Sequence, residues 1–107
     1  MEISQRLEPE WFDADGAGFL CAPLTASQRI TVARHVDTDD FGQAILSAAR
    51  FAVKDWRGIT QNDRPVPFTA AAFDDLFANA EMATTLLPLG MFIINRSRFS
   101  ADDEKKS

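Results

Sequence analysis

The segment from residue 41 to residue 57 constrains the fold most, because its apolar side chains recur with the spacing of a single helix face. We predict one long amphipathic helix here, with polar and basic residues on the opposite face. Asp39 and Asp40 precede it, where carboxylates cap a helix and complement its positive end, and Lys54 and Arg57 lie near its negative end. Gly58 follows and suits the left-handed position just past a helix. The predicted apolar face consists of Phe41, Ile45, Ala48, Ala49, Ala52, Val53 and Trp56.

A second helix is predicted before this segment. Thr25 and Gln28 have the spacing of a capping box, in which each side chain binds the backbone of the other residue. The helix that follows is expected to end near Asp37. Its apolar face carries Ile30, Ala33 and Val36.

Further helices are predicted in the C-terminal part. Thr69 is placed to cap a short helix, and Asn79 or Ala80 begins another turn. A last helix is expected from about Pro88, since proline is tolerated in a first helical turn. Residues 86–94 are apolar nearly all round, so this helix lies in the core or is covered by another chain. The short helix is expected to turn Phe73, Leu76 and Phe77 inward.

The N-terminal part differs, because aromatic and apolar pairs flank a segment rich in Asp and Gly at residues 13–18. This arrangement predicts a short β-hairpin at residues 11–22. We therefore predict a mainly α fold, a small single domain of four to five helices with a short N-terminal β-hairpin. Residues 1–10 are expected to be flexible, residues 11–99 to form the helical domain, and residues 100–107 to be a disordered charged tail.

Composition narrows the classes of function. The net charge of −5 argues against a nucleic-acid partner, because no concentrated basic face offsets it. The single cysteine, Cys21, cannot form an internal disulfide, which fits a reducing cytoplasm and favours a small apolar filler. The longest apolar run, residues 86–94, is about half of the ~20 residues that a membrane span needs, and the N-terminus lacks a signal peptide.

Catalytic patterns are missing from the sequence as well. No serine lies in a nucleophile elbow, and Cys21 and His35 are separated with no third group implied. The acidic pair Asp74 and Asp75 falls near a helix start, where it complements the dipole. We predict that the protein is not an enzyme and has no catalytic, cofactor-binding or metal-binding residues.

The string VKDWRGITQNDRPVPFT at residues 53–69 carries a more specific pattern. Followed by a short helix, it resembles the V-x-x-W-x-G…(D-G-x)-P-V-P-F-T pattern of tail assembly chaperones of long-tailed, siphovirus-type phages and prophages. The resemblance extends over roughly residues 41–99. The family often has Asp-Gly in the turn, where this chain has Asn62-Asp63-Arg64, and these residues also tolerate turn conformations. The matching residues are Val53, Trp56, Gly58, Pro65, Pro67, Phe68 and Thr69.

This resemblance implies a cytoplasmic chaperone of the bacterial host that binds the tape measure protein and helps recruit tail tube subunits. It also implies that the protein leaves before the tail is complete and is absent from the mature virion. The alternative is a small structural tail protein, such as a connector or completion subunit that remains in the virion. Neither function involves nucleic acid or a membrane.

A chaperone of this kind needs exposed apolar surface for clients and for self-association. A domain of this size cannot surround an apolar helix completely, so part of the last helix is available for an interface. Phe51 lies off the main apolar face of its helix, close to the basic residues, where it either flanks the core or forms a further contact with a partner. The candidate partner or oligomer surface therefore comprises Phe51, Leu87, Met91 and Ile94.

Overall fold

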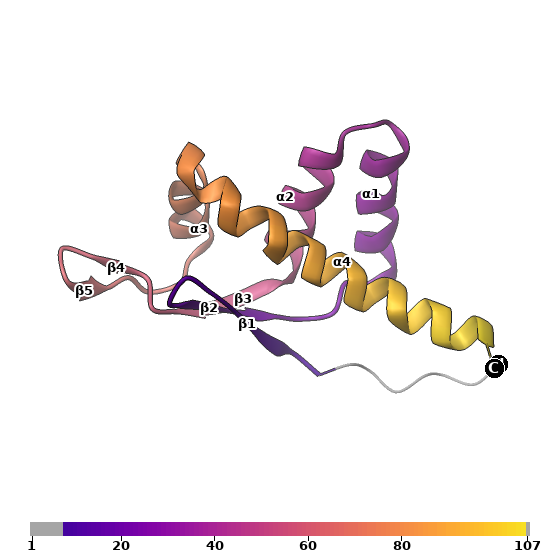
Figure 1. The fold of residues 1–107 in the computed structure, drawn as a ribbon, viewed down its shortest axis with the longest axis horizontal. Helices are drawn as coiled ribbons and strands as arrows, with labels where there is room; N and C mark the ends of the chain where they lie inside the picture. The colour runs from indigo at the N-terminus through magenta and orange to yellow at the C-terminus, as the bar shows by residue number, and fades with distance from the viewer. Residues whose placement is uncertain (1–7, 107) are drawn as a thin grey trace.

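The chain folds into a small antiparallel sheet with helices packed on one of its faces (Figure 1). The computed structural model describes residues 8–106, with side chains from residue 8 to residue 96. The main sheet has the strand order β1-β2-β3, and β4 and β5 form a separate hairpin that projects from the body. The elements in chain order are β1 (Glu10–Ala14), β2 (Ala17–Cys21), α1 (Ala26–Asp37), α2 (Phe41–Ala52), β3 (Val53–Arg57), β4 (Thr60–Gln61), β5 (Arg64–Pro65), α3 (Ala70–Phe77), the 3₁₀ turn η1 (Ala80–Met82) and α4 (Ala83–Lys106).

The prediction of a mainly α fold with one short hairpin is wrong, because the long helix expected over residues 41–57 divides into two elements. Helix α2 ends at Ala52, and β3 joins the N-terminal hairpin as a third strand. Lys54 and Arg57 therefore belong to a strand and do not lie at the negative end of a helix. The fold is mixed α and β.

A β-bulge explains why β3 resembles a helix in the sequence. Val53 and Trp56 are three residues apart, which is the spacing of a helix face, and both side chains are buried. In the sheet Val53 pairs with Cys21 and Trp56 pairs with Phe19, so Lys54 is the extra residue of an irregular register. The bulge brings both apolar side chains to the covered face of the sheet.

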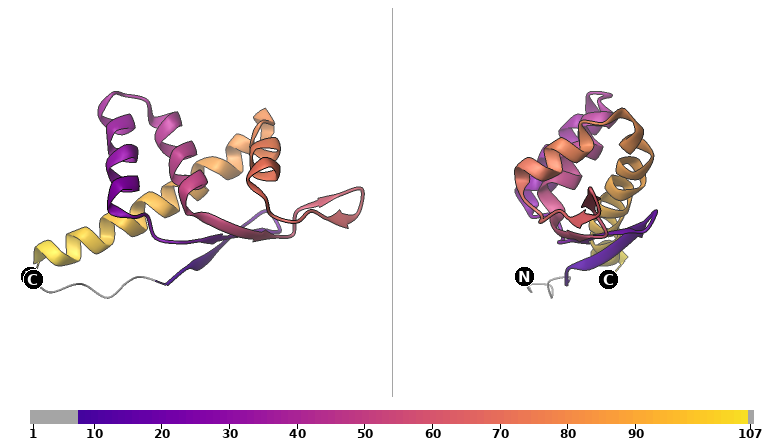
Figure 2. Two further views of the ribbon diagram at one scale, coloured as in Figure 1. Left: turned by 180° about the vertical axis from the view of Figure 1, so that it is seen from behind. Right: turned by 90° about the vertical axis from the view of Figure 1, so that its left-hand side faces the viewer.

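The hairpin predicted at residues 11–22 is confirmed by strands β1 and β2. Asp15 and Gly16 form its tip, with φ angles of 52° and 82° that suit a tight two-residue turn. Phe12 of β1 packs against Phe92 of α4, with ring centroids 5.0 Å apart. Helix α4 crosses the molecule over the hairpin, as the views from the front and from the end show (Figures 1 and 2).

The predicted helix caps are confirmed. Thr25 Oγ1 accepts a hydrogen bond from the Gln28 backbone N–H, and the Thr25 N–H donates to Gln28 Oε1, which completes the capping box. Asp40 accepts from the Gln43 N–H at the start of α2, and Thr69 caps α3. Local sequence signals therefore fix where these helices begin.

The last helix begins earlier than predicted, at Ala83, so that Pro88 lies inside it. Proline has no N–H for the carbonyl of Thr84, and both residues are exposed, so water can bind that carbonyl. Further along, α4 crosses α2 closely at Gly90. A Cβ added at Gly90 would lie 2.6 Å from Ile45 Cγ2 and 3.0 Å from the Ile45 carbonyl oxygen.

The two ends of the chain were predicted to be flexible or disordered. Residues 1–7, most of the flexible N-terminus expected at residues 1–10, lie outside the described residues, and Glu10 begins β1. A disordered tail was expected over residues 100–107. The helical backbone of α4 continues to Lys106, and the side chains after Arg96 lie outside the described ones.

Candidate protein-binding groove

Two of the residues that match the family pattern, Trp56 and Phe68, belong to an aromatic cluster beside the sheet. The cluster is defined here as Phe19, Trp56, Phe68, Phe73 and Phe77. As predicted, Trp56 is buried, with 6% of its surface exposed. Its ring meets Phe68 edge to face at 5.2 Å and Phe19 at 6.5 Å, and its Nε1–H donates to the Val66 carbonyl at 2.7 Å. The Phe19 ring in turn lies 6.0 Å from that of Phe77, so it connects Trp56 to α3.

The other matching residues also have roles in the fold. Gly58 does not end a helix. It has a φ of 76° beside the hairpin tip, where an added Cβ would lie within 2.4 Å of the Gly16 carbonyl oxygen. Pro65 lies in β5, Pro67 is exposed in the link that follows, and Thr69 caps α3. The pattern therefore organises one end of the molecule.

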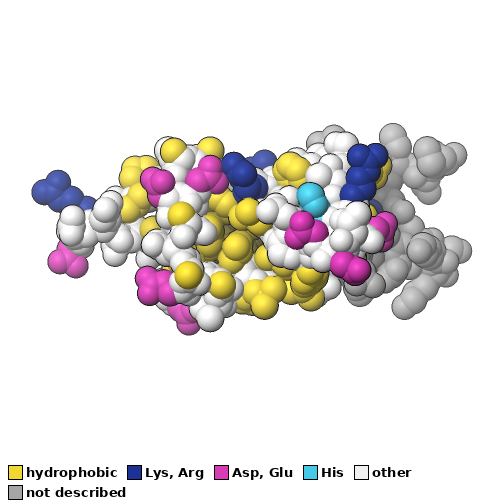
Figure 3. Space-filling model, turned by 90° about the horizontal axis from the view of Figure 1, so that it is seen from above, with side chains coloured by type: hydrophobic (Ala, Val, Ile, Leu, Met, Phe, Trp, Pro, Cys, Tyr) yellow, Lys and Arg dark blue, Asp and Glu magenta, His cyan; other side chains and the backbone are white. Residues whose placement is uncertain are grey.

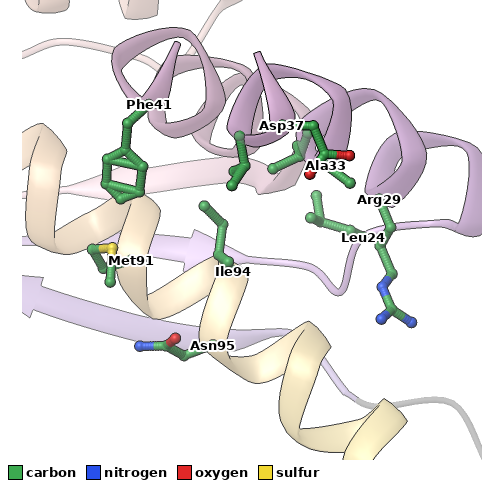
Figure 4. Close-up of a pocket in the computed structure, with 10 residues that line it drawn as sticks. Leu24, Arg29, Ala33, Asp37, Phe41, Met91, Ile94 and Asn95 are labelled. Carbon is green, nitrogen blue, oxygen red and sulfur yellow. The ribbon is translucent and has the colours of Figure 1, made fainter. Parts of the chain in front are cut away.

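A groove lies at a different place, between α1, the start of α2, and α4 (Figure 4). Its volume is about 460 Å³, and its lining is mainly apolar. Phe41 lies at one end above Met91, and Arg29 lies at the opposite end beside Leu24, with Ile94 between them. The lining residues are Leu24, Arg29, Val32, Ala33, Val36, Asp37, Phe41, Met91, Ile94 and Asn95.

The groove is open to solvent, and several of its apolar side chains are exposed. Phe41 is 44% exposed and Val36 is 45% exposed, although both residue types are usually covered in a folded protein. Hydrophobic side chains also gather across the middle of the molecule when it is viewed from above (Figure 3). An exposed apolar hollow between helices is a common binding site for apolar side chains of another molecule.

The four candidate surface residues fall in three places. Met91 and Ile94 line the groove. Leu87, one helical turn before Met91, is 51% exposed but does not line it. Phe51 is half-buried and packs against the core, so it is not part of this surface. The structure therefore brings together only two of the four.

The α1 wall of the groove was not identified as a surface from the sequence. Ala33 and Val36 were recognised as members of an apolar helix face, which by itself predicts a face turned to the core. The shortness of the chain was the available signal. In this small protein α2 and α4 already cover the sheet, so a further helix has little surface left to pack against. Only the placement of α1 outside α2 leaves this face open.

The described residues offer little for metal, thiol or membrane chemistry. No three His, Cys, Asp or Glu side chains among them converge to hold a metal ion. Burial raises the pKa of the Cys21 thiol to about 12, which leaves it protonated and unreactive at neutral pH. Among the described helices none is by itself long and apolar enough to cross a membrane. Only the bent pair formed by residues 70–77 and 80–96, with a 96° angle, could do so by length and composition.

Comparison with known proteins finds no matching family model, no matching curated protein and no matching solved structure. What the protein binds is therefore inferred from its own residues.

Proposed function

We propose that this protein is a tail assembly chaperone of a long-tailed phage or prophage, which binds the tape measure protein and assists assembly of the tail tube. The observation that carries the proposal is the open apolar groove lined by Phe41, Met91 and Ile94. The pattern from Val53 to Thr69 supports the choice of family.

The chemistry of the groove suits an aggregation-prone client. An amphipathic helix can insert apolar side chains spaced at i, i+3 or i+4, and i+7 into a groove between helices. Binding covers apolar surface of both molecules, which the free client would otherwise bury against other copies of itself. The net charge of −5 repels one loaded chaperone from another and so opposes aggregation. We place this activity in the host cytoplasm, before the tail is complete.

The proposal is tested by co-expression with a long helical tape measure protein, whose gene we expect to lie beside the gene of this chain. The measured quantity is the fraction of tape measure protein that stays in solution after centrifugation. We expect the wild-type chain to raise this fraction and the double change Met91→Lys and Ile94→Lys to abolish the increase. Because Ile94 is half-buried, Phe41→Glu provides a second test, since a carboxylate is favourable in the first turn of α2.

The control for added lysine is Ala71→Lys, which places one lysine on the exposed part of α3, away from the groove. It should retain full client solubilisation. Thermal unfolding of every variant separates loss of binding from loss of fold. The proposal fails if folded Phe41→Glu protein solubilises the client as well as wild type does. Detection of the chain in purified virions by mass spectrometry would favour a connector or completion subunit instead.

A further inference from the structure

Helix α1 is covered by its own chain on only one side. Of its twelve residues Val32 alone is buried. Ile30 is 57% exposed and Val36 is 45% exposed, and Ala33 between them is exposed as well. Isolated helices of about 12–15 residues are marginal in water, so an apolar face left open on such a helix is a place where a further contact stabilises it.

The exposed face is symmetric in sequence about its centre. Within an arc of about 120°, at 3.6 residues per turn, α1 presents Ala26 in its first turn and five exposed residues centred on Ala33, which we call the α1 stripe. Ala33 lies at the middle, apolar residues follow three positions away in both directions, and opposite charges follow four positions away. The stripe consists of Arg29, Ile30, Ala33, Val36 and Asp37.

The two charges of the stripe are not explained within the chain. Arg29 lies near the N-terminus of α1 and Asp37 at its C-terminus, so each is at the unfavourable end of the helix dipole. Neither forms an ion pair with another side chain among the described residues. They are separated by eight residues, or about 12 Å along the helix.

We propose that α1 pairs antiparallel with α1 of a second copy of this chain, across a two-fold axis at Ala33. In this arrangement Arg29 meets Asp37 of the partner subunit, and Ile30 packs against Val36 of the partner subunit. The small Ala33 side chains at the axis allow the helices to approach closely. A two-fold interface requires a surface complementary to itself, and a stripe with opposite charges at equal distances from its centre meets that requirement.

The stripe is smaller than the interface of a permanent dimer, which takes about 20–30 residues on each side. The association is therefore reversible, with a dissociation constant in the micromolar range or above. Four of the five stripe residues also line the groove, namely Arg29, Ala33, Val36 and Asp37. The inference does not rest on the proposed function, because it is tested on the protein alone, without a client.

The experiment is sedimentation equilibrium from about 1 µM to about 1 mM, which brackets the affinity of a small interface. We expect the average mass of the wild type to rise toward that of a dimer. Arg29→Asp alone and Asp37→Arg alone place like charges opposite each other at two symmetric positions and should weaken association about tenfold. Both changes favour the dipole of α1, so neither should lower the melting temperature of the monomer.

Mixing provides the decisive measurement. An equimolar mixture of the Arg29→Asp chain and the Asp37→Arg chain restores opposite charges at both positions, so it should associate more tightly than either variant alone. The double variant should associate like wild type. Ala33→Lys, which puts a long charged side chain at the axis, should remain monomeric in every mixture.

The matched controls carry the same charge changes elsewhere. Lys54→Asp in β3 and Asp75→Arg in α3 alter exposed residues outside the stripe and should associate like wild type. The inference is overturned if the wild type stays monomeric throughout, which would leave the stripe to a different protein. It is also overturned if the single variants associate like wild type, or if their mixture associates no more tightly than either variant alone.

Discussion

The aromatic cluster and helix α1 are both rich in apolar side chains, yet the chain covers one and leaves the other open. In the aromatic cluster five rings from β2, β3, α3 and the link before α3 contact one another in series. Along α1 the apolar residues Ile30 and Val36 face solvent. Both regions carry apolar side chains, and the difference lies in which other segments of the chain reach them.

This comparison shows how a small domain divides its apolar surface. The rings pack where three segments distant in sequence converge on the covered face of the sheet. Helix α1 lies outside α2, and α4 faces it only across the open groove. Stability and binding are therefore expected to separate, with substitutions in the cluster affecting unfolding and substitutions in the α1 stripe affecting association.

The largest effect is expected from Trp56→Ala. Removing a large buried aromatic side chain costs about 3–5 kcal/mol, and here it also leaves the Val66 carbonyl without its indole donor. Denaturant unfolding should show a strongly lowered midpoint. Trp11→Ala is the matched control, because Trp11 is half-buried on the other face of the sheet, under Arg57, and should cost about 1 kcal/mol. Equal midpoints for the two variants would place Trp56 outside the core.

A smaller loss is expected from Gly90→Ala. The added methyl group would collide with Ile45 at the crossing of α2 and α4, and overpacking of this kind costs about 1–3 kcal/mol. Gly42→Ala in α2 is the control, since nothing lies within 4 Å of its Cβ position. That variant should gain about 0.5–1 kcal/mol. The close crossing would be refuted if both variants unfolded at the same denaturant concentration.

A local effect of about 1 kcal/mol is expected from Thr25→Ala, because the capping box of α1 is lost. Helix α1 has few buried contacts, so its amides should already exchange faster than those of α2, and the variant should accelerate them about fivefold. Residue-by-residue hydrogen exchange measures the rates in α1 and α2, both in the wild type and in the variant. Faster exchange of α2 to the same extent would mean that the two helices open as one unit.

The smallest effect at neutral pH is expected at Cys21, which is buried in the core. Its thiol should not react with a thiol reagent in the native protein, and it should react on unfolding. Because burial raises its pKa to about 12, the stability due to the neutral thiol is complete below pH 9.0 and is lost as the pH rises toward 12. Unfolding free energies measured across this range should decline less steeply in Cys21→Ala. Rapid native labelling at pH 7 would contradict the burial.

Features that depend on neighbouring residues were determined by the sequence itself. The caps at Thr25, Asp40 and Thr69 form as their spacing predicts, because a capping side chain binds a backbone N–H only three residues away. The hairpin tip at Asp15 and Gly16 follows from residues that tolerate a positive φ. Trp56 is buried, as expected of a residue on the predicted apolar face, although it lies in β3 and not in a helix.

Only the tertiary structure decided where α2 ends and which apolar face stays open. Val53 and Trp56 have a spacing that fits a helix, and they lie in a strand because Cys21 and Phe19, more than thirty residues earlier, offer backbone partners across a bulge. In the same way Met91 and Ile94 form a groove only because α1 lies opposite them. Pairing between distant segments leaves no signal in the local spacing of apolar residues. A periodic pattern shows which residues share a face, and the rest of the chain determines what covers that face.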